Sequence, residues 1–326
     1  AVQAQDYAAA TWAIGLRIRN STETEIERAF NEGTILRTHV MRPTWHFVMP
    51  EDIRWMIELT APRVKAQLAH YDRRLGLDEA LYEKSNAAIV EALHDAIYLT
   101  RRELKAVLAD AGIETDVQRL GHIIARAELD GLICSGPRRG KQFTYALMEE
   151  RVPDCRTLPR DEALARLALI YFSSHGPAQL KYFSWWSGLG ANDAKIALEQ
   201  IASKVRQETL DGKTYWYVPA PMEPIPEPPP ALLLSIYDEY TIAYKDRGDI
   251  SEARDIERMI SMGNALTAVI VLNGRVAGTW NRTSKNNIVE IRLNPFRKLD
   301  GDEQEALESE VARYGRFFGM PAVLVR

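Results

Sequence analysis

Residues 100–147 have the sequence TRRELKAVLADAGIETDVQRLGHIIARAELDGLICSGPRRGKQFTYAL, which contains the most regular local pattern of the chain. Thr100 and Glu103 form the N-cap and N3 positions of a capping box, which predicts a helix over 101–111. Apolar residues at helical spacing predict a second, amphipathic helix over 116–130. Together these elements indicate a helix-turn-helix.

A hairpin is predicted directly after the second helix. Short apolar strands over 132–134 and 143–147 flank a basic turn at 136–141. The order helix, turn, helix, hairpin is typical of a winged helix, which commonly places its second helix in a DNA major groove and its wing near phosphates. We expect three residues of the turn to contact phosphate, although wings are often only solvated basic turns: Arg138, Arg139 and Lys141.

The same order of elements recurs on both sides of this stretch. After it, we expect helices over 161–174, 178–187 and 191–203 and strands over 204–209 and 214–218. Before it, we expect helices over 7–18 and 22–32 and strands over 35–38 and 44–48. Three winged-helix units in tandem therefore account for about two thirds of the chain.

The C-terminal third has a different character. Residues 219–230 are rich in proline, which excludes helix and central strand and predicts an extended connector. Beyond it, we expect strands over 231–236, 266–272, 275–280, 288–293 and 322–325 and a helix over 302–318. Asn273-Gly274 is a strong signal for a hairpin turn. A small barrel or sandwich would protect the strand edges.

The predicted fold class is α+β, with tandem winged-helix (helix-turn-helix) units followed by a small C-terminal β-barrel or sandwich. A chain of 326 residues exceeds the usual range of a single hydrophobic core. The predicted domains are a first winged-helix unit at 1–60, a second at 61–155, a third at 156–218, the connector at 219–230 and the β-rich domain at 231–326. Because the sequence starts at Ala1 without a methionine, we expect the first unit to lack N-terminal residues.

Composition excludes several classes of protein. No apolar run approaches the roughly 20 residues of a membrane span, and no secretory signal opens the chain. The two cysteines, Cys134 and Cys155, show no partnering pattern, which fits a reducing cytoplasm. Histidines and cysteines do not fall at metal-ligand spacings, and no phosphate-binding glycine motif occurs, so we expect neither a metal nor a nucleotide cofactor. A net charge of −4 leaves nucleic-acid binding to local basic surfaces.

Several short segments, spread in order over almost the whole chain, carry a resemblance to a known family. They are Val2-Gln3-Ala4-Gln5-Asp6, Arg42-Pro43-Thr44-Trp45-His46, His175-Gly176-Pro177-Ala178, Phe183-Ser184-Trp185-Trp186-Ser187-Gly188-Leu189, Tyr237-Asp238-Glu239-Tyr240 and Tyr244-Lys245-Asp246-Arg247. The set resembles the AlkZ/YcaQ-type winged-helix DNA glycosylases, in the AlkZ-like branch, which unhook bulky alkylation adducts and interstrand crosslinks.

This resemblance implies a monofunctional DNA glycosylase without cofactors. Its partner would be double-stranded DNA that contains alkylated bases. We expect a monomer in the cytoplasm, associated with the nucleoid. The family's Gln-x-Gln motif falls on Gln3 and Gln5, which are therefore the predicted catalytic residues.

The chemistry of two glutamines fits a substrate that is already activated. In an extended segment, Gln3 and Gln5 would point the same way, whereas on a helix they would lie about 200° apart. Glutamine does not ionise, but it can orient a water and donate a hydrogen bond. That is sufficient when the leaving group is a cationic N3- or N7-alkylated purine. Without the resemblance, both residues would be taken for solvated side chains; Asp6, a third candidate, would point away from them.

Three further groups are candidates for a DNA-binding surface or a lesion pocket. Arg42, Thr44, Trp45 and His46 could line the pocket, although Trp45 and His46 could equally belong to the core. A second group, which could as easily form a structural ion-pair network, consists of Asp238, Glu239, Tyr240, Lys245 and Arg247. The third is a polar hairpin tip over 282–287 that includes Arg282 and Lys285 and could be only an exposed loop.

Two other classes of function compete with the glycosylase. A non-catalytic DNA-binding protein or transcriptional regulator would use the winged helices for sequence readout and would be indifferent to loss of Gln3 or Gln5. A protein-interaction scaffold would bind duplex DNA with little dependence on salt.

Overall fold

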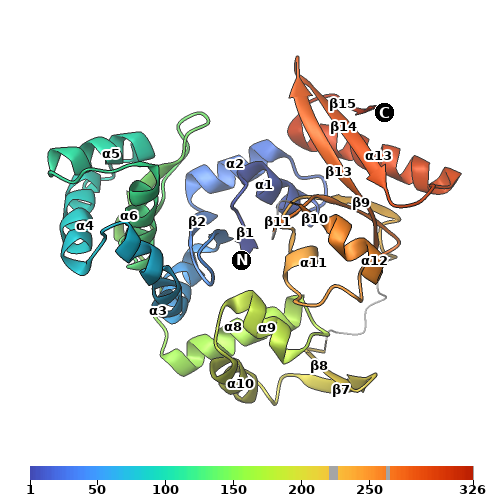
Figure 1. Cartoon of the computed structure of the whole chain (residues 1–326), viewed down its shortest axis with the longest axis horizontal. Coiled ribbons are helices and arrows are strands. Elements are labelled where there is room, and N and C mark those ends of the chain that lie inside the picture. Colours follow the sequence, from blue (N-terminus) through green and yellow to red (C-terminus); the bar gives the residue numbers. More distant parts are fainter. Residues whose placement is uncertain (220–226, 262–264, 326) are drawn as a thin grey trace. The chain divides into compact units, whose positions relative to one another are not determined.

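The computed structural model describes residues 1–219, 227–261 and 265–325, and its fold is mixed α and β (Figure 1). Its contacts group the chain into two compact units. Unit 1 comprises Ala1 and Arg28–Pro219, and unit 2 comprises Val2–Glu27 and the described residues after Pro219. Most of the predicted connector at 219–230 lies outside the described residues, and the division into five domains stays a prediction.

Near its start, unit 1 contains a β-hairpin. Helix α2 (Glu23–Glu32) precedes strands β2 (Leu36–His39) and β3 (Trp45–Val48), which pair antiparallel from Leu36↔Val48 to His39↔Trp45. The Phe30 ring on α2 packs edge-on against Phe47 on β3, with centroids 6.0 Å apart. The elements predicted for this stretch are therefore confirmed.

Two long helices follow in a stretch for which no element was predicted. Helix α3 (Pro50–Arg74) starts with a proline at a position where a missing N–H costs no intrahelical hydrogen bond. Helix α4 (Glu79–Leu93) begins at Asp78, whose carboxylate accepts from the Leu81 N–H at 2.9 Å. The apolar face of α4, including Ile89, packs into a core shared with the next two helices.

Those next helices and their hairpin match the opening prediction. Helix α5 (Arg101–Asp110) has the capping box at Thr100 and Glu103, and helix α6 (Val117–Leu129) is capped by Asp116. The strands β4 (Leu99–Thr100), β6 (Thr144–Leu147) and β5 (Ile133–Ser135) form a sheet in that order, followed by the short helix α7 (Met148–Arg151). The order helix, helix, hairpin is thus present.

The second repeat is also present, with three helices and a hairpin. It consists of α8 (Arg160–Ser174), α9 (Leu180–Ser187), α10 (Ala191–Gln200), β7 (Arg206–Leu210) and β8 (Lys213–Tyr217). The strands pair antiparallel, and both turn residues, Asp211 and Gly212, have positive φ. A two-residue turn of this kind matches the right-handed twist of the strands.

Unit 2 is organised around one five-stranded sheet. Its order is β15 (Ala322–Val325), β14 (Ile288–Pro295), β13 (Arg275–Lys285), β12 (Val269–Leu272) and β9 (Ala231–Leu234). All neighbours pair antiparallel except β14 and β15. Asn273 and Gly274 form the predicted two-residue turn, with Leu272 opposite Arg275. Shorter elements complete the unit: α11 (Glu239–Ile242), α12 (Ala253–Ile256), a 3-10 turn at Glu257–Met259, β10 (Ile260–Ser261) and β11 (Ala265–Leu266).

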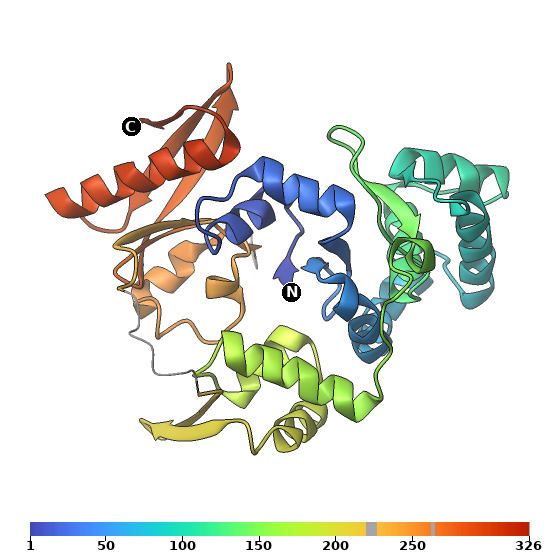
Figure 2. The ribbon, with the colours of Figure 1, turned by 180° about the vertical axis from the view of Figure 1, so that it is seen from behind.

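The described part of unit 2 contains no closed barrel, which was one of the two predicted alternatives, and helices cover the sheet. Helices α1 (Tyr7–Gly15) and α13 (Gly301–Phe318) contribute the large side chains of this core. The Trp12 and Trp280 rings lie 4.9 Å and 5.5 Å from the ring of Tyr314. Both views show α13 against the sheet (Figures 1 and 2). Helix packing buries the apolar face of the sheet without pairing the edge strands β9 and β15 with each other.

In the described part of the chain, no helix has the length and apolar character to cross a membrane.

Candidate active site

The predicted catalytic glutamines lie in a short non-helical segment before α1. Strand β1 (Val2–Gln3) is extended, Gln5 lies in a bend, and α1 begins only at Tyr7. Ala4 between the glutamines is fully buried at 0% exposure, whereas Gln3 is half-buried and Gln5 is exposed. The backbone therefore has the non-helical character that the hypothesis requires. That both amides point into one volume stays a prediction.

Asp6 has a structural task in this segment. Its carboxylate accepts from the Ala9 N–H at 2.9 Å and caps α1. The helix is then fixed to β9 and the residue that follows it: the Trp12 indole donates to the Leu233 carbonyl at 2.7 Å, and the Ser235 hydroxyl donates to the Ala9 carbonyl at 2.9 Å. These bonds anchor the glutamine segment to the sheet of unit 2.

A buried carboxylate lies next to the motif. The Gln3 N–H donates to Oε1 of Glu239 at 3.3 Å, and Glu239 is only 6% exposed. Glu239 belonged to the mixed-sign group that was predicted as either a cleft lining or an ion-pair network. Its contact with Gln3, which lies 236 positions away, was not predicted.

Asp238 is the buried member of an ion pair with Arg17, whose side chain is 44% exposed. Both of its carboxylate oxygens accept from the Arg17 guanidinium, at 2.9 and 2.8 Å, and one also accepts from the Tyr240 N–H at 2.9 Å. Burial opposes the positive charge of Arg17, but the hydrogen bonds and charge of Asp238, aided by Glu239, more than offset it and raise the Arg17 pKa. The Arg17–Asp238 pair thus fixes the first turn of α11, which presents Glu239 to Gln3.

The other members of this predicted group have local roles. The Tyr240 hydroxyl donates to the Gly274 carbonyl at 2.5 Å, and the Arg247 side chain donates to the Thr241 carbonyl at 3.1 Å. Burial lowers the pKa of Arg247. Lys245 is exposed. These contacts favour a structural role for Asp238 and Arg247 over the lining of a cleft.

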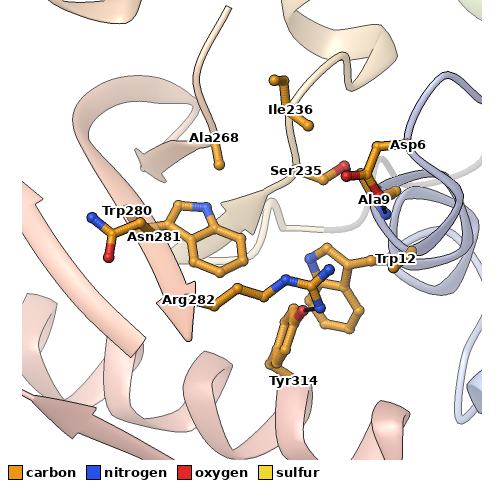
Figure 3. Close-up of a pocket in the computed structure, with 11 residues that line it drawn as sticks. Asp6, Ala9, Trp12, Ser235, Ile236, Ala268, Trp280, Asn281, Arg282 and Tyr314 are labelled. Atoms are coloured by element: carbon orange, nitrogen blue, oxygen red, sulfur yellow. Dashed lines mark hydrogen bonds between the residues drawn. The ribbon is translucent and has the colours of Figure 1, made fainter. Parts of the chain in front are cut away.

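A small cavity lies beside the capping residue Asp6 (Figure 3). Its volume is about 90 Å³, and its walls include Trp12, Trp280 and Tyr314. Figure 3 shows the Arg282 side chain extending toward the Tyr314 hydroxyl, to which it donates a hydrogen bond. Pockets for drug-sized ligands measure about 300–1,000 Å³, so this cavity suits water-sized molecules and not a purine.

The predicted hairpin tip was placed too early in the chain. Arg282 and Lys285 belong to strand β13, with Arg282 opposite Ile291. The turn itself consists of Asn286 and Asn287, which both have positive φ. The Arg282 guanidinium packs over the rings of Tyr314 and Phe318 on α13, because a strand residue facing the helix buries its stem there. Lys285 remains exposed next to the turn.

In unit 1, the predicted pocket residues 42–46 form a compact loop and strand. His46 is fully buried; its Nδ1 lies 3.0 Å from the Thr44 carbonyl and its Nε2 lies 3.3 Å from the Arg42 guanidinium. Trp45 is half-buried, and its indole donates to Oε1 of Glu128 at 3.3 Å. His46 is therefore a hydrogen-bonded core residue that holds Arg42 and Thr44, while Trp45 keeps one part of its ring accessible.

Gly188, the residue that ends α9, packs closely against the backbone of Met41 just before this loop. It has φ +71°, and a Cβ at this position would lie 2.1 Å from the Met41 carbonyl oxygen. Gly188→Ala should lower the free energy of unfolding by about 2 kcal/mol or more, from the strained backbone and the clash. Gly131→Ala is a matched control, since Gly131 has φ +70° but a Cβ added there would meet no atom within 4 Å. Equal losses for the two variants in urea unfolding would contradict the close approach.

A basic groove with aromatic walls also lies in unit 1. The Arg37 guanidinium lies 4.2 Å from the centroid of Trp45 and 4.5 Å from that of Phe143. The groove has a volume of about 500 Å³, and its other cationic lining residues are Arg101, Arg102, Lys105 and Lys141. Val117, 80% exposed at the start of α6, also lines it. Stacked aromatic and cationic side chains are typical of nucleic-acid surfaces.

Of the three predicted wing contacts, only Lys141 lines this groove. Arg139 instead pairs with Glu103 at 2.7 Å and donates to the Tyr98 carbonyl at 2.7 Å. The Thr100 N–H and hydroxyl, followed by Arg139, lower the pKa of Glu103 to about 2. The Arg138 N–H donates to Asn31, and its guanidinium lies 5.5 Å from the Phe143 centroid. The sequence pattern missed Arg37, Arg101, Arg102 and Lys105, because only the fold brings them together.

Comparison with known proteins places the chain in a family. The model of the family "DNA glycosylase AlkZ-like" matches residues 1–317, so the chain belongs to the AlkZ-like DNA glycosylase family. A curated relative is the interstrand DNA cross-link repair glycosylase of Streptomyces sahachiroi, 23% identical over 340 residues that cover 100% of this chain and 90% of the relative.

The fold agrees with this membership. The solved structure of Streptomyces sahachiroi DNA glycosylase AlkZ superposes with a TM-score of 0.79 at 21% identity, covering 99% of this chain and 91% of that chain. The resemblance stated from the short segments is therefore confirmed at the level of the family. In the described part of this chain, no group of three or more His, Cys, Asp or Glu side chains is placed to hold a metal ion.

Proposed function

We propose that this protein is a monofunctional DNA glycosylase that hydrolyses the N-glycosidic bond of cationic N-alkylated purines in double-stranded DNA, including bulky adducts and interstrand crosslinks. Gln3 and Gln5 position the attacking water. One observation carries the proposal: the motif of the family lies in a non-helical segment whose central Ala4 is buried between two more accessible glutamines. The Gln3–Glu239 bond and the cap at Asp6 hold this segment in place.

The reaction needs no acid from the protein. The water oxygen forms a bond to C1′ of the deoxyribose, and the electron pair of the C1′–N bond passes to the purine. This cancels the positive charge of the purine, and a proton of the water leaves to solvent. A neutral damaged base, such as uracil, would leave as an anion and would require stronger assistance. Glutamine amides, which position a water without ionising, suit the cationic case.

For DNA binding, we infer that each helix, helix, hairpin repeat acts as a winged helix. The start of α6 and the groove beside it would then face the duplex. In this arrangement Lys141, Lys105 and Arg102 contact phosphates, while Trp45 and Phe143 offer ring faces. We propose a monomer that acts on nucleoid DNA in the cytoplasm. The name of the Streptomyces sahachiroi relative suggests crosslinks as a substrate to test here as well.

The direct test is incubation of the protein with duplexes that carry N7-methylguanine, an N3-alkyladenine or a mustard-type crosslink. Release of the base, detected as alkali-labile abasic sites, supports the proposal, and inertness toward a uracil duplex supports the selectivity. Tight binding to one undamaged sequence without base release would favour a transcriptional regulator instead. Salt-insensitive duplex binding would favour a scaffold.

The groove yields a separate prediction on salt dependence. Lys141→Ala should reduce the slope of log K against log salt concentration by about 0.9, the change expected when one phosphate contact is lost. Lys84→Ala on the exposed surface of α4 is the control and should leave the slope unchanged. The measurement is duplex binding by fluorescence anisotropy at several salt concentrations. Identical slopes for wild type and Lys141→Ala would show that Lys141 contacts no phosphate. They would contradict the proposal that the groove binds DNA.

A further inference from the structure

Glu239 is the acidic side chain that the structure brings to the Gln-x-Gln motif. Its carboxylate accepts from the Gln3 N–H at 3.3 Å while the side chain is almost fully buried. A buried carboxylate is costly, because its charge loses most of its hydration. A neutral acceptor would satisfy the Gln3 N–H at a lower desolvation cost. The charge of this carboxylate acts on Arg17, and the same carboxylate lies next to the Gln-x-Gln motif.

The proposed reaction has a use for that charge. As the C1′–N bond breaks, positive charge develops on the sugar, and glycoside hydrolases commonly meet it with carboxylates. Neither Gln3 nor Gln5 can supply a negative charge, because amides do not ionise. A fixed negative group in a water-poor site stabilises such a transition state without reorganising at the moment of reaction.

Charged and polar side chains surround Glu239 and hold it in place. In the turn after α1, Arg17 carries a positive charge that interacts with both Asp238 and Glu239. On α11, the buried Asp238 caps the helix that begins with Glu239. Tyr244, which follows α11, is held neutral: burial, and then the neighbouring Tyr240 and the charge of Glu239, raise its pKa to about 12. Arg17, Asp238 and Tyr244 are therefore three of the titratable neighbours of Glu239.

We propose that Glu239 is a positioning and electrostatic residue of the glycosylase site, which holds Gln3 through its backbone and supplies the negative charge that stabilises the cationic sugar. This inference rests on the proposed function and adds to it a residue outside the Gln-x-Gln motif. The ligand class that follows is a positively charged five-membered ring at the lesion position.

The test compares two uncleavable abasic analogues in duplex DNA, a cationic pyrrolidine and a neutral tetrahydrofuran. The wild type should bind the pyrrolidine duplex more tightly, and Glu239→Gln should reduce this preference by about 10- to 100-fold, as expected for one charge within several ångströms. Affinity for the tetrahydrofuran duplex should change little. A purely structural role would weaken both duplexes alike and leave their ratio unchanged, which would overturn the proposal.

Three further measurements sharpen this test. Glu305→Gln makes the same change of charge on the exposed surface of α13 and should leave the preference intact. Glu239→Asp should restore part of it, because the charge returns on a shorter stem. In single-turnover release of N7-methylguanine, Glu239→Gln should be slower than the wild type, and Glu239→Asp should recover part of the rate.

The outcomes separate the two proposals. If the wild type releases no alkylated base from any duplex, the proposed function fails. If it does release base while Glu239→Gln matches it in rate and in pyrrolidine preference, only the role of Glu239 fails. Urea unfolding of each variant shows whether the fold is retained, and Glu239→Asp keeps the test valid if Glu239→Gln is unstable.

Discussion

Gln5→Ala and Gln3→Ala should each slow single-turnover release of N7-methylguanine by at least about 100-fold. Both side chains are proposed to orient the attacking water, and loss of a positioning group of this kind costs several kcal/mol of the barrier. Gln5 is exposed in the bend before α1, so its truncation removes no core packing. Affinity for a lesion duplex should therefore change only a few-fold. The measurement is base release with the enzyme in excess, paired with anisotropy binding.

The control for this pair is Gln304→Ala, which truncates an exposed glutamine on α13 and should keep the wild-type rate. Gln3 is half-buried, and its backbone is held by Glu239, so Gln3→Ala tests the side chain while leaving that bond possible. Wild-type rates in both motif variants would refute the assignment of catalysis to the two amides. They would favour a role for the segment in packing alone.

Elements set by local sequence could be predicted. The capping box at Thr100 and Glu103 and the turn at Asn273-Gly274 both rest on residues within a few positions of each other, and both are present in the structure. The order helix, helix, hairpin followed in the same way. The two long helices after Val48 were not predicted, and α3 even contains Pro62, which alone would indicate a break.

The covering of the C-terminal sheet could not be predicted, because it depends on opposite ends of the chain. Trp12 on α1 and Tyr314 on α13 meet in one aromatic core, and no local pattern connects them. Arg282 illustrates the consequence. Its polar neighbours suggested a solvent-exposed tip, yet the register of β13 and β14 places it opposite Ile291 and against α13.

The candidate site also has a part that local sequence predicts and a part that only the fold creates. The motif Gln3-Ala4-Gln5 was recognisable in the sequence, and its non-helical backbone followed from the chemistry assigned to it. The contact between Glu239 and Gln3 was not predicted, and neither was any role of Arg17. Arg17 is separated from Asp238 by 221 positions. Only the folded chain brings this pair next to Glu239, which contacts Gln3. Sequence therefore identified the candidate motif but not the residues that hold its backbone in place.

Arg17→Ala should be among the most destabilising single substitutions in unit 2. It would leave the carboxylate of Asp238 with 0% exposure and without its two guanidinium bonds, and breaking a buried pair in this way costs about 3–5 kcal/mol. Asp238→Asn should cost less, about 1–2 kcal/mol, because the Arg17 side chain is 44% exposed and can regain water. Urea unfolding followed by tryptophan fluorescence measures both.

The double variant Arg17→Ala with Asp238→Asn completes the cycle. Because the second change removes the stranded charge, it should be more stable than Arg17→Ala alone, which is the sign expected for a coupled pair. If Arg17→Ala costs less than about 1 kcal/mol, or if the two losses simply add, the pair contributes no more than a surface ion pair. The first turn of α11 would then need another support, and the placement of Glu239 beside Gln3 would no longer depend on Arg17.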